Sequence, residues 1–232
     1  MPRRIAIIML ASLLLSPIAA ENPDREPFGR LATPATQQRS LQAKWEGVET
    51  DIRADRQVLK ACLADRTGCP AAAARLLAII DDARTRQGLD KYDAVNRAVN
   101  AAIGIKSDIE QHGVDDLWSS PLTTFRNGFG DCEDFAIAKY VALGEAGTVP
   151  NDLRIVIVRQ RSPEFHVVLA ARLDRRWMIL DIPRSDIIED TATHYVPRFI
   201  IDHRGLREIR LPDRPVADAS TAEWPGTATT CG

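Results

Sequence analysis

The stretch that decides the fold is residues 128–135, which read Gly128-Phe129-Gly130-Asp131-Cys132-Glu133-Asp134-Phe135. The apolar residues that follow recur at helical spacing up to Leu143, so the sequence predicts a helix with Cys132 in its first turn. The amino end of a helix carries partial positive charge, which favours a cysteine thiolate there. The amides of that turn can also bind the oxyanion of a tetrahedral intermediate. Cys132 is therefore the candidate nucleophile.

Downstream of this helix the pattern changes to strands. Runs rich in branched apolar residues span 153–158, 166–173 and 177–182. The short polar joint at residues 174–176 predicts a hairpin, so the second and third runs are expected to pair antiparallel. His166 begins one strand of that hairpin and Asp181 lies at the end of the other, which makes them neighbours. Asp181 can then orient His166 while His166 takes the proton of Cys132.

Each of these three residues also has an ordinary structural interpretation. A cysteine with apolar neighbours is often a small buried hydrophobe. A histidine at a strand end is often a surface group, and an aspartate after a strand often starts a turn. The order of a helix start, a strand start and the end of the paired strand favours a Cys132, His166 and Asp181 triad over three unrelated structural residues.

Upstream of the nucleophile the sequence predicts helices. Helical patterns cover residues 37–64, a second segment that Pro70 opens and Gly88 breaks, and residues 91–103. Residues 104–130 are expected to be loop with short turns, and weaker strands are expected at 195–201 and 206–209. Helices followed by an antiparallel sheet indicate an α+β fold.

The first residues have the layout of a secretory signal. Arg3 and Arg4 precede an apolar run from Ile5 to Leu15, and small residues follow up to Ala20. We expect a signal peptide over residues 1–20 that is cleaved on export to the periplasm; an uncleaved anchor is the alternative. The mature chain is expected to have a flexible lead-in over 21–35, one peptidase domain over 36–211 and a flexible tail over 212–232, with no membrane span.

The bulk composition is that of a globular protein. The chain has 232 residues, of which 45% are hydrophobic and 27% charged, and its formal net charge is -2. Basic residues are scattered without a long stripe, which argues against a nucleic-acid partner. The remaining histidines show no metal-ligand spacing, so zinc is not expected.

The residues from Gly130 to Tyr140 resemble the active-site helix of the bacterial transglutaminase-like cysteine proteinases, and the similarity runs from about Val95 to Ile201. That family includes periplasmic proteases that release large surface adhesins. The resemblance implies a papain-like or transglutaminase-like cysteine peptidase fold and a Cys-His-Asp triad at Cys132, His166 and Asp181. Many members carry asparagine directly after the triad aspartate, where this chain has Ile182.

An acidic collar surrounds the nucleophile, formed by Asp131, Glu133 and Asp134. Three carboxylates beside a thiol disfavour the thiolate, so something should offset their charge. One possibility is the helix dipole, with Asp131 as the N-cap. The other is a bound calcium ion, which prefers oxygen ligands. The resemblance adds that adhesin-releasing members depend on calcium at the matching positions, with Asp131 and Glu133 as the best ligands and Asp134 third.

Export also bears on the other cysteines. Cys62 and Cys69 bracket a short segment and are the natural disulfide pair in an oxidising compartment; two unpaired cysteines at a helix turn are the alternative. No function is assigned to Cys231. Trp118, in the loop before the nucleophile, is a candidate for lining the cleft or for a core or rim aromatic.

Three functions remain compatible with these residues. The first is an endopeptidase that acts on a protein substrate, with a surface adhesin as one candidate and an inner-membrane receptor as a candidate partner. The second is acyl transfer or deamidation of glutamine, since both also begin with a thioester. The third is a binding module that keeps the fold without catalysis, against which the intact triad argues.

Overall fold

The computed structural model describes residues 25–160, 165–182 and 184–209. The predicted signal segment, the predicted tail and Cys231 lie outside these residues. Within the described ranges, no helix combines the length and the apolar character needed to cross a membrane.

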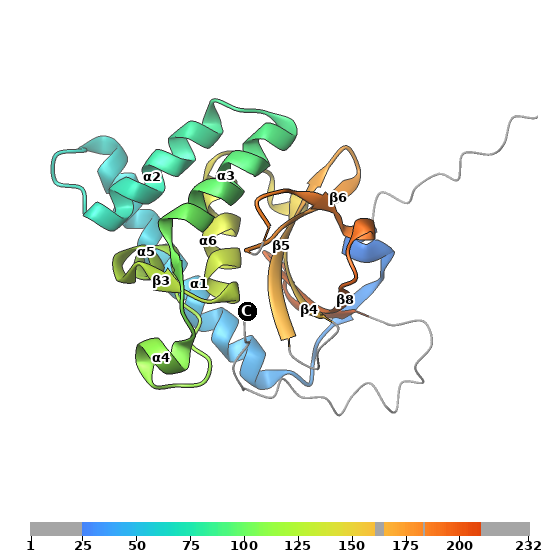
Figure 1. Ribbon diagram of the computed structural model, residues 1–232. Coiled ribbons are helices and arrows are strands. Elements are labelled where there is room, and N and C mark those ends of the chain that lie inside the picture. The colour runs from blue at the N-terminus through green and yellow to red at the C-terminus, as the bar shows by residue number, and fades with distance from the viewer. Residues whose placement is uncertain (1–24, 161–164, 183, 210–232) are drawn as a thin grey trace, which may run out of the picture.

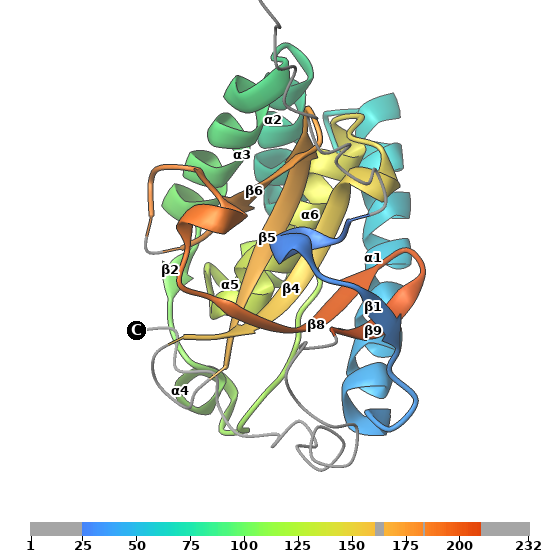
Figure 2. The same ribbon diagram turned by 90° about the vertical axis from the view of Figure 1, so that its right-hand side faces the viewer.

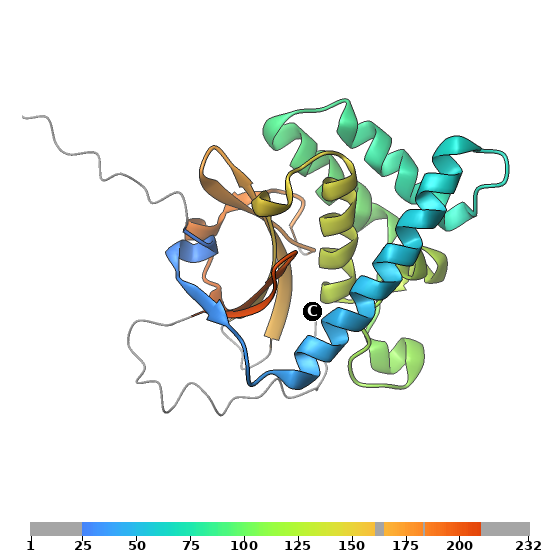
Figure 3. The same ribbon diagram turned by 180° about the vertical axis from the view of Figure 1, so that it is seen from behind.

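Six helices precede or begin at Cys132 in the described part of the chain: α1 (Arg39–Ala64), α2 (Ala71–Arg84), α3 (Gly88–Ala102), α4 (Asp108–His112), α5 (Pro121–Asn127) and α6 (Cys132–Glu145). The long helix α1 buries Leu41, Trp45, Val48 and Ile52, whose spacing of three or four places them on one face. Helix α6 is buried along most of its length because it lies between the other helices and the sheet (Figures 1 and 3).

The main sheet is antiparallel and curved, with the strand order β1-β9-β8-β4-β5-β6-β7 (Figures 1 and 2). Its strands are β1 (Ala32–Pro34), β4 (Leu153–Arg159), β5 (Phe165–Leu173), β6 (Arg176–Leu180), β7 (Ile188–Glu189), β8 (Val196–Asp202) and β9 (Gly205–Ile209). A separate parallel pair joins β2 (Gly104–Ile105) to β3 (Phe129–Gly130). Three short 3-10 helices complete the elements of the described residues: η1 (Pro27–Gly29), η2 (Pro150–Asp152) and η3 (Asp190–Ala192).

The predicted hairpin is confirmed. Strands β5 and β6 pair antiparallel, with Leu169 opposite Leu180. Asp174 and Arg175 both have positive φ, 49° and 66°, as the tight turn of a twisted two-residue hairpin requires.

Both faces of the sheet are buried, and this explains the continuous apolar runs in its central strands. Ile155, Ile157 and Leu169 face the helices and join the main core. Val156 and Val168, which alternate with them, belong to a second cluster on the other face. The fold class is therefore the expected α+β arrangement of helices on an antiparallel sheet.

Three segments differ from the sequence-based expectation. Gly88, expected to break the second helix, is instead the first residue of α3, and α2 already ends at Arg84. Residues 104–130, expected as loop, contain α4, α5 and the β2–β3 pair. Within the expected flexible lead-in, β1 pairs with β9, which supplies hydrogen bonds that no local pattern in the sequence reveals.

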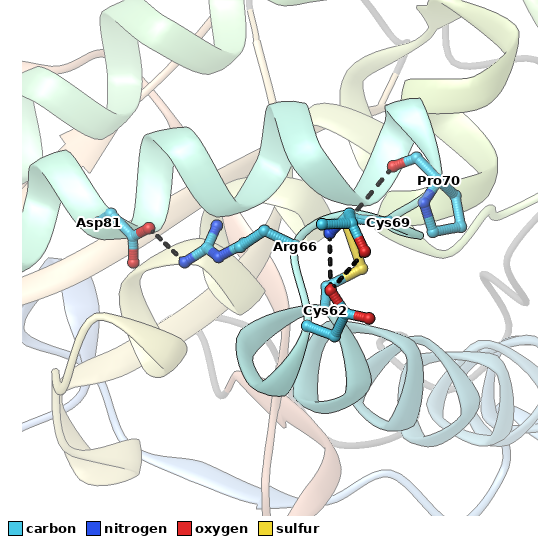
Figure 4. The surroundings of a disulfide bond; sticks show 7 residues. Cys62, Arg66, Cys69, Pro70 and Asp81 are labelled. Atoms are coloured by element: carbon cyan, nitrogen blue, oxygen red, sulfur yellow. Dashed lines mark hydrogen bonds and ion pairs between the residues drawn. A yellow bond between two sulfur atoms is a disulfide. The ribbon is translucent and has the colours of Figure 1, made fainter.

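A disulfide joins Cys62 to Cys69, with the two Cα atoms 5.0 Å apart (Figure 4). It closes the turn between α1 and α2. Within that turn the amide of Cys69 lies 3.5 Å from the Arg66 carbonyl oxygen, and the Arg66 side chain reaches Asp81 on α2 at 2.8 Å (Figure 4). The expected pairing is confirmed, and it ties the end of α1 to the segment that leads into α2.

Candidate active site and acidic cluster

Cys132 is the first residue of α6, and its side chain is fully buried. The helical hydrogen bonds begin with the amide of Phe135, which donates to the carbonyl of Asp131 at 3.2 Å. The amides of residues 132–134 therefore precede the helical ladder, and they are the donors that a helix amino end offers to an anion. Sγ of Cys132 lies 3.4 Å from Oε2 of Glu133.

His166 and Asp181 meet as the sequence predicted. Nε2 of His166 lies 2.7 Å from Oδ1 of Asp181, and both side chains are almost completely buried. Burial by itself would raise the pKa of Asp181, but the hydrogen bonds and positive charge around it keep its pKa below the usual range. Asp181 is therefore an ionised acceptor that can hold an imidazolium.

The second ring nitrogen of His166, Nδ1, is buried and has no hydrogen-bond partner among the described residues. Within the same ranges no hydrogen bond joins the His166 ring to Cys132, although α6 packs directly against β5. Catalytic hydrogen bonds often shorten only when a substrate is bound. With Nε2 held by Asp181, Nδ1 is the nitrogen that remains to exchange a proton with a nucleophile.

The acidic collar is larger than the sequence indicated. One oxygen each from Asp108, Asp131 and Asp134 lie within 4.8 Å of one another, and the same holds for Asp108, Asp116 and Glu133. Asp108 belongs to both groups and therefore links them. All except Asp116 are at most 3% exposed, and the side chain of Asp116 is 2% exposed.

Only part of this cluster is satisfied by hydrogen bonds. The Ser119 amide donates to Oδ1 of Asp134 at 2.8 Å, and the Leu117 amide donates to Asp108. Asp116 accepts from Trp118 Nε1 at 2.9 Å and forms an ion pair with Lys44 at 3.0 Å. Trp118 is thus a buried aromatic that positions an acidic side chain.

Asp131 does not cap the helix with its side chain, although it occupies the N-cap position. Oδ1 of Asp131 and Oδ1 of Asp108 are buried without a hydrogen-bond partner in the part of the chain that the structure describes. Helix capping therefore does not explain the side-chain position of Asp131. The expected contact of Asp134 with the neighbouring loop is present as the hydrogen bond from the Ser119 amide.

Burial and mutual repulsion act together on these groups. Burial raises the pKa of Asp131 to about 8, with Asp134 and Asp108 adding to the effect. The pKa values of Glu133 and Asp134 are raised well above their usual ranges for the same two reasons. Such carboxylates must either hold protons at neutral pH or face a cation.

The cluster fits a calcium ion. Calcium takes six to eight oxygen ligands at about 2.3–2.6 Å, so two ligands of one ion lie at most about 5 Å apart. The carboxylate oxygens on Asp108, Asp131 and Asp134 meet that limit. The buried oxygens of Asp131 and Asp108 that lack a described partner are the groups that gain most from a bound cation.

Sequence reasoning missed Asp108 and Asp116 as members of this cluster. Asp108 opens α4 behind Ser107, which forms a capping box with Glu110, so its pattern reads as helix capping. Asp116 lies in a segment without regular pattern. Both are more than ten residues before Cys132, and the β2–β3 pair together with the Ser119–Asp134 hydrogen bond brings their segment beside α6.

In a comparison with protein families, the model of the bacterial transglutaminase-like cysteine proteinases matches residues 56–203. This range contains the triad candidates and the whole acidic cluster. No curated protein matches the chain.

Among solved structures, LapG from Legionella pneumophila is similar, with a TM-score of 0.55 and 25% sequence identity. The similarity covers 66% of this chain and 87% of that protein. Calcium-bound LapG matches equally well over the same shares of both chains. A structure of EGTA-treated LapG also matches with a TM-score of 0.55.

Proposed function

The chain belongs to the bacterial transglutaminase-like cysteine proteinases, and from that premise we propose that it is an exported endopeptidase with Cys132, His166 and Asp181 as its triad. The observation that carries the proposal is the buried hydrogen bond from His166 Nε2 to Asp181, on the strand pair against which the Cys132 helix packs. Family membership identifies the chain as a cysteine peptidase. The triad residues and the substrate are our proposals.

The proposed reaction follows from the positions of these groups. Nδ1 of His166 accepts the proton of Cys132, and the thiolate attacks the carbonyl carbon of a peptide bond. Amides at the start of α6 bind the oxyanion. His166 returns the proton to the leaving amine, which leaves a thioester on Cys132. Water, deprotonated by His166, then hydrolyses the thioester and releases the new carboxylate.

The acidic cluster is proposed to hold one calcium ion, with Asp131 and Glu133 as the best ligands, Asp134 third, and Asp108 and Asp116 as further candidate ligands. Beyond the ion pair of Lys44 with Asp116, a bound divalent cation would supply positive charge to offset the remaining carboxylates. With their charge offset, Asp131, Glu133 and Asp134 can stay ionised without disfavouring the thiolate of Cys132. The similarity to calcium-bound LapG supports this assignment.

The substrate is proposed to be a protein outside the inner membrane, because the first residues have the layout of an export signal. A large surface adhesin and an inner-membrane receptor are the candidate substrate and partner, on the basis of the family resemblance. The same export-signal layout supports a periplasmic location for the cleavage of the substrate.

The triad is tested with pre-reduced mature protein and a mixture of unfolded proteins as the probe, with new amino termini mapped by mass spectrometry. Cys132→Ala and His166→Ala should abolish the cleavages. His194→Ala is the matched control, since His194 is an exposed histidine outside the triad, and it should cleave like the wild type. Cleavage that persists in Cys132→Ala would overturn the proposal. Incorporation of a primary amine into glutamine side chains without cleavage would assign acyl transfer instead.

The calcium site is tested separately by calorimetry on demetallated protein. Calcium should bind at one site and raise the melting temperature, because it binds only the folded state. Glu133→Gln should weaken binding at least about tenfold, since it removes one ligand charge while keeping the side-chain shape. Glu145→Gln, the same change at the other end of α6, is the control. Absence of both heat and melting shift in the wild type would remove calcium from the proposal.

A further inference from the structure

Tyr195 lies directly before β8 and contacts the active-site aspartate. Its hydroxyl donates a hydrogen bond of 2.5 Å to Oδ2 of Asp181. The sequence pattern marks Tyr195 only as part of a weak strand, and nothing in its neighbourhood predicts a role at the site.

This hydrogen bond gives the second carboxylate oxygen of Asp181 a donor. Oδ1 already accepts from Nε2 of His166 and from the amide of Ile182, both at 2.7 Å. Tyr195 supplies the donor for the other oxygen, so the carboxylate is held at both ends. A carboxylate fixed in this way cannot rotate about its last bond without breaking a hydrogen bond in a buried site.

Tyr195 also contacts the histidine. The rings of His166 and Tyr195 meet edge to face, with centroids 5.9 Å apart and planes at 60°. One side chain therefore limits the rotation of Asp181 through a hydrogen bond and the tilt of the imidazole through packing. The two restraints come from the residue that leads into β8, whereas His166 and Asp181 come from β5 and the end of β6.

The backbone of Asp181 is fixed from the opposite side. Nδ2 of Asn100 on α3 donates to the carbonyl of Asp181 at 2.9 Å. One turn earlier on the same helix, Asn96 donates to the carbonyl of Arg184 at 3.2 Å. With the backbone held by α3, the remaining freedom of Asp181 is in its side chain, which is where Tyr195 acts.

We propose that Tyr195 is a positioning residue of the peptidase, which holds Asp181 and His166 in the orientation that lets Nδ1 of His166 serve Cys132. The inference rests on the proposed triad. Tyr195 touches no reacting atom; it acts through Asp181 and through the imidazole.

Loss of the Tyr195 hydroxyl affects both Asp181 and His166. Other charged groups around this pair are Lys139 on α6, which faces Asp181, and Arg184, which faces Tyr195. Without the hydroxyl, Oδ2 of Asp181 loses the hydrogen bond from Tyr195, and the carboxylate can rotate. The loosened orientation of Asp181 and His166 then lowers kcat.

The test compares Tyr195→Phe with Tyr92→Phe, a matched control. The hydroxyl of Tyr92 makes a comparable hydrogen bond of 2.8 Å, to the carbonyl of Arg172 at a distance from the triad. Both variants keep the ring, and thermal melting checks that they are folded. The first readout is the rate at which iodoacetamide alkylates Cys132 of pre-reduced protein across pH, followed on the Cys132 peptide. The second is kcat and KM on a peptide that the wild type cleaves.

Tyr195→Phe should lower kcat by roughly tenfold with KM little changed, the size expected for one lost hydrogen bond to a charged group. It should also slow the alkylation of Cys132 at neutral pH, because a misoriented His166 accepts the thiol proton less readily. Tyr92→Phe should leave both kcat and the alkylation rate unchanged.

A Tyr195→Phe protein that is folded, with wild-type kcat and a wild-type alkylation rate of Cys132, would overturn the inference. If Cys132→Ala also cleaves the peptide, the proposed triad fails. If Cys132→Ala is inactive and Tyr195→Phe is unaffected, only the role of Tyr195 is refuted.

Discussion

Lys139 is a buried lysine that should destabilise the protein in a pH-dependent way. It lies on α6, two turns after Cys132, and is 1% exposed. Burial lowers its pKa from 10.5 to about 7, and the nearby carboxylate of Asp181 only partly opposes this effect. Its ammonium contacts the face of Phe135 at 5.9 Å. The perturbation is Lys139→Met, which keeps the length of the side chain and removes its charge.

The magnitude follows from that pKa. A pKa lowered from 10.5 to about 7 corresponds to about 5 kcal/mol at 1.36 kcal/mol per pH unit. The folded state binds the proton less tightly, so between these two pH values the unfolded chain holds more protons and stability rises with pH. Below pH 7 the full cost is present. Lys139→Met should therefore raise the free energy of unfolding by up to about 5 kcal/mol at pH 6 and by about 2 kcal/mol at pH 9.

The assay is urea unfolding of both proteins at pH 6 and pH 9, with the difference between them taken at each pH so that all shared titrating groups cancel. Lys60→Met is the control, since Lys60 is an exposed lysine within a helix. Its difference from the wild type should be small and independent of pH. A Lys139→Met difference that stays constant between pH 6 and pH 9, or that is destabilising at pH 6, would refute the reasoning.

Two further predictions concern stability around the site. Replacing both Cys62 and Cys69 by serine should lower the free energy of unfolding by about 2.5 kcal/mol through the lost loop constraint, measured by urea unfolding without reductant; an unchanged midpoint would contradict this. Gly130→Ala should destabilise by about 1–3 kcal/mol, because the added methyl group would overpack the site. That methyl would lie 2.8 Å from Cβ of Asp134 and 3.0 Å from Cγ2 of Thr124. Thermal melting in chelator measures this loss of stability, and calorimetry should show weakened calcium binding. A wild-type melting temperature together with wild-type calcium affinity would contradict the close packing around Gly130.

Much of the fold could be predicted from the sequence because it depends on local chemistry. Apolar spacing of three and four places α1 and α6 close to where they occur. The Asp174-Arg175 turn can be recognised as a hairpin, and once the hairpin is placed, His166 and Asp181 must be near one another. Cys62 and Cys69 are so close in sequence that few other pairings compete.

The tertiary structure decided what depends on segments distant in sequence. Asp108 and Asp116 join the acidic cluster through tertiary contacts, among them the parallel β2–β3 pair and the Ser119–Asp134 hydrogen bond, which bring their segment to α6. Tyr195 reaches Asp181 because β8 pairs with β4 rather than with its neighbour in sequence, β7, and β1 becomes a strand only when β9 offers an edge.

The physical reason is the range of the interactions. Helix periodicity, turn conformation and a short disulfide loop are fixed by residues within one or two turns of each other, so the sequence by itself determined the helix that begins at Cys132 and the His166–Asp181 pair. Strand order, buried charge clusters and the pKa values inside them depend on which distant segments share a desolvated space, and for Lys139, Tyr195 and the acidic cluster only the packed chain determines that.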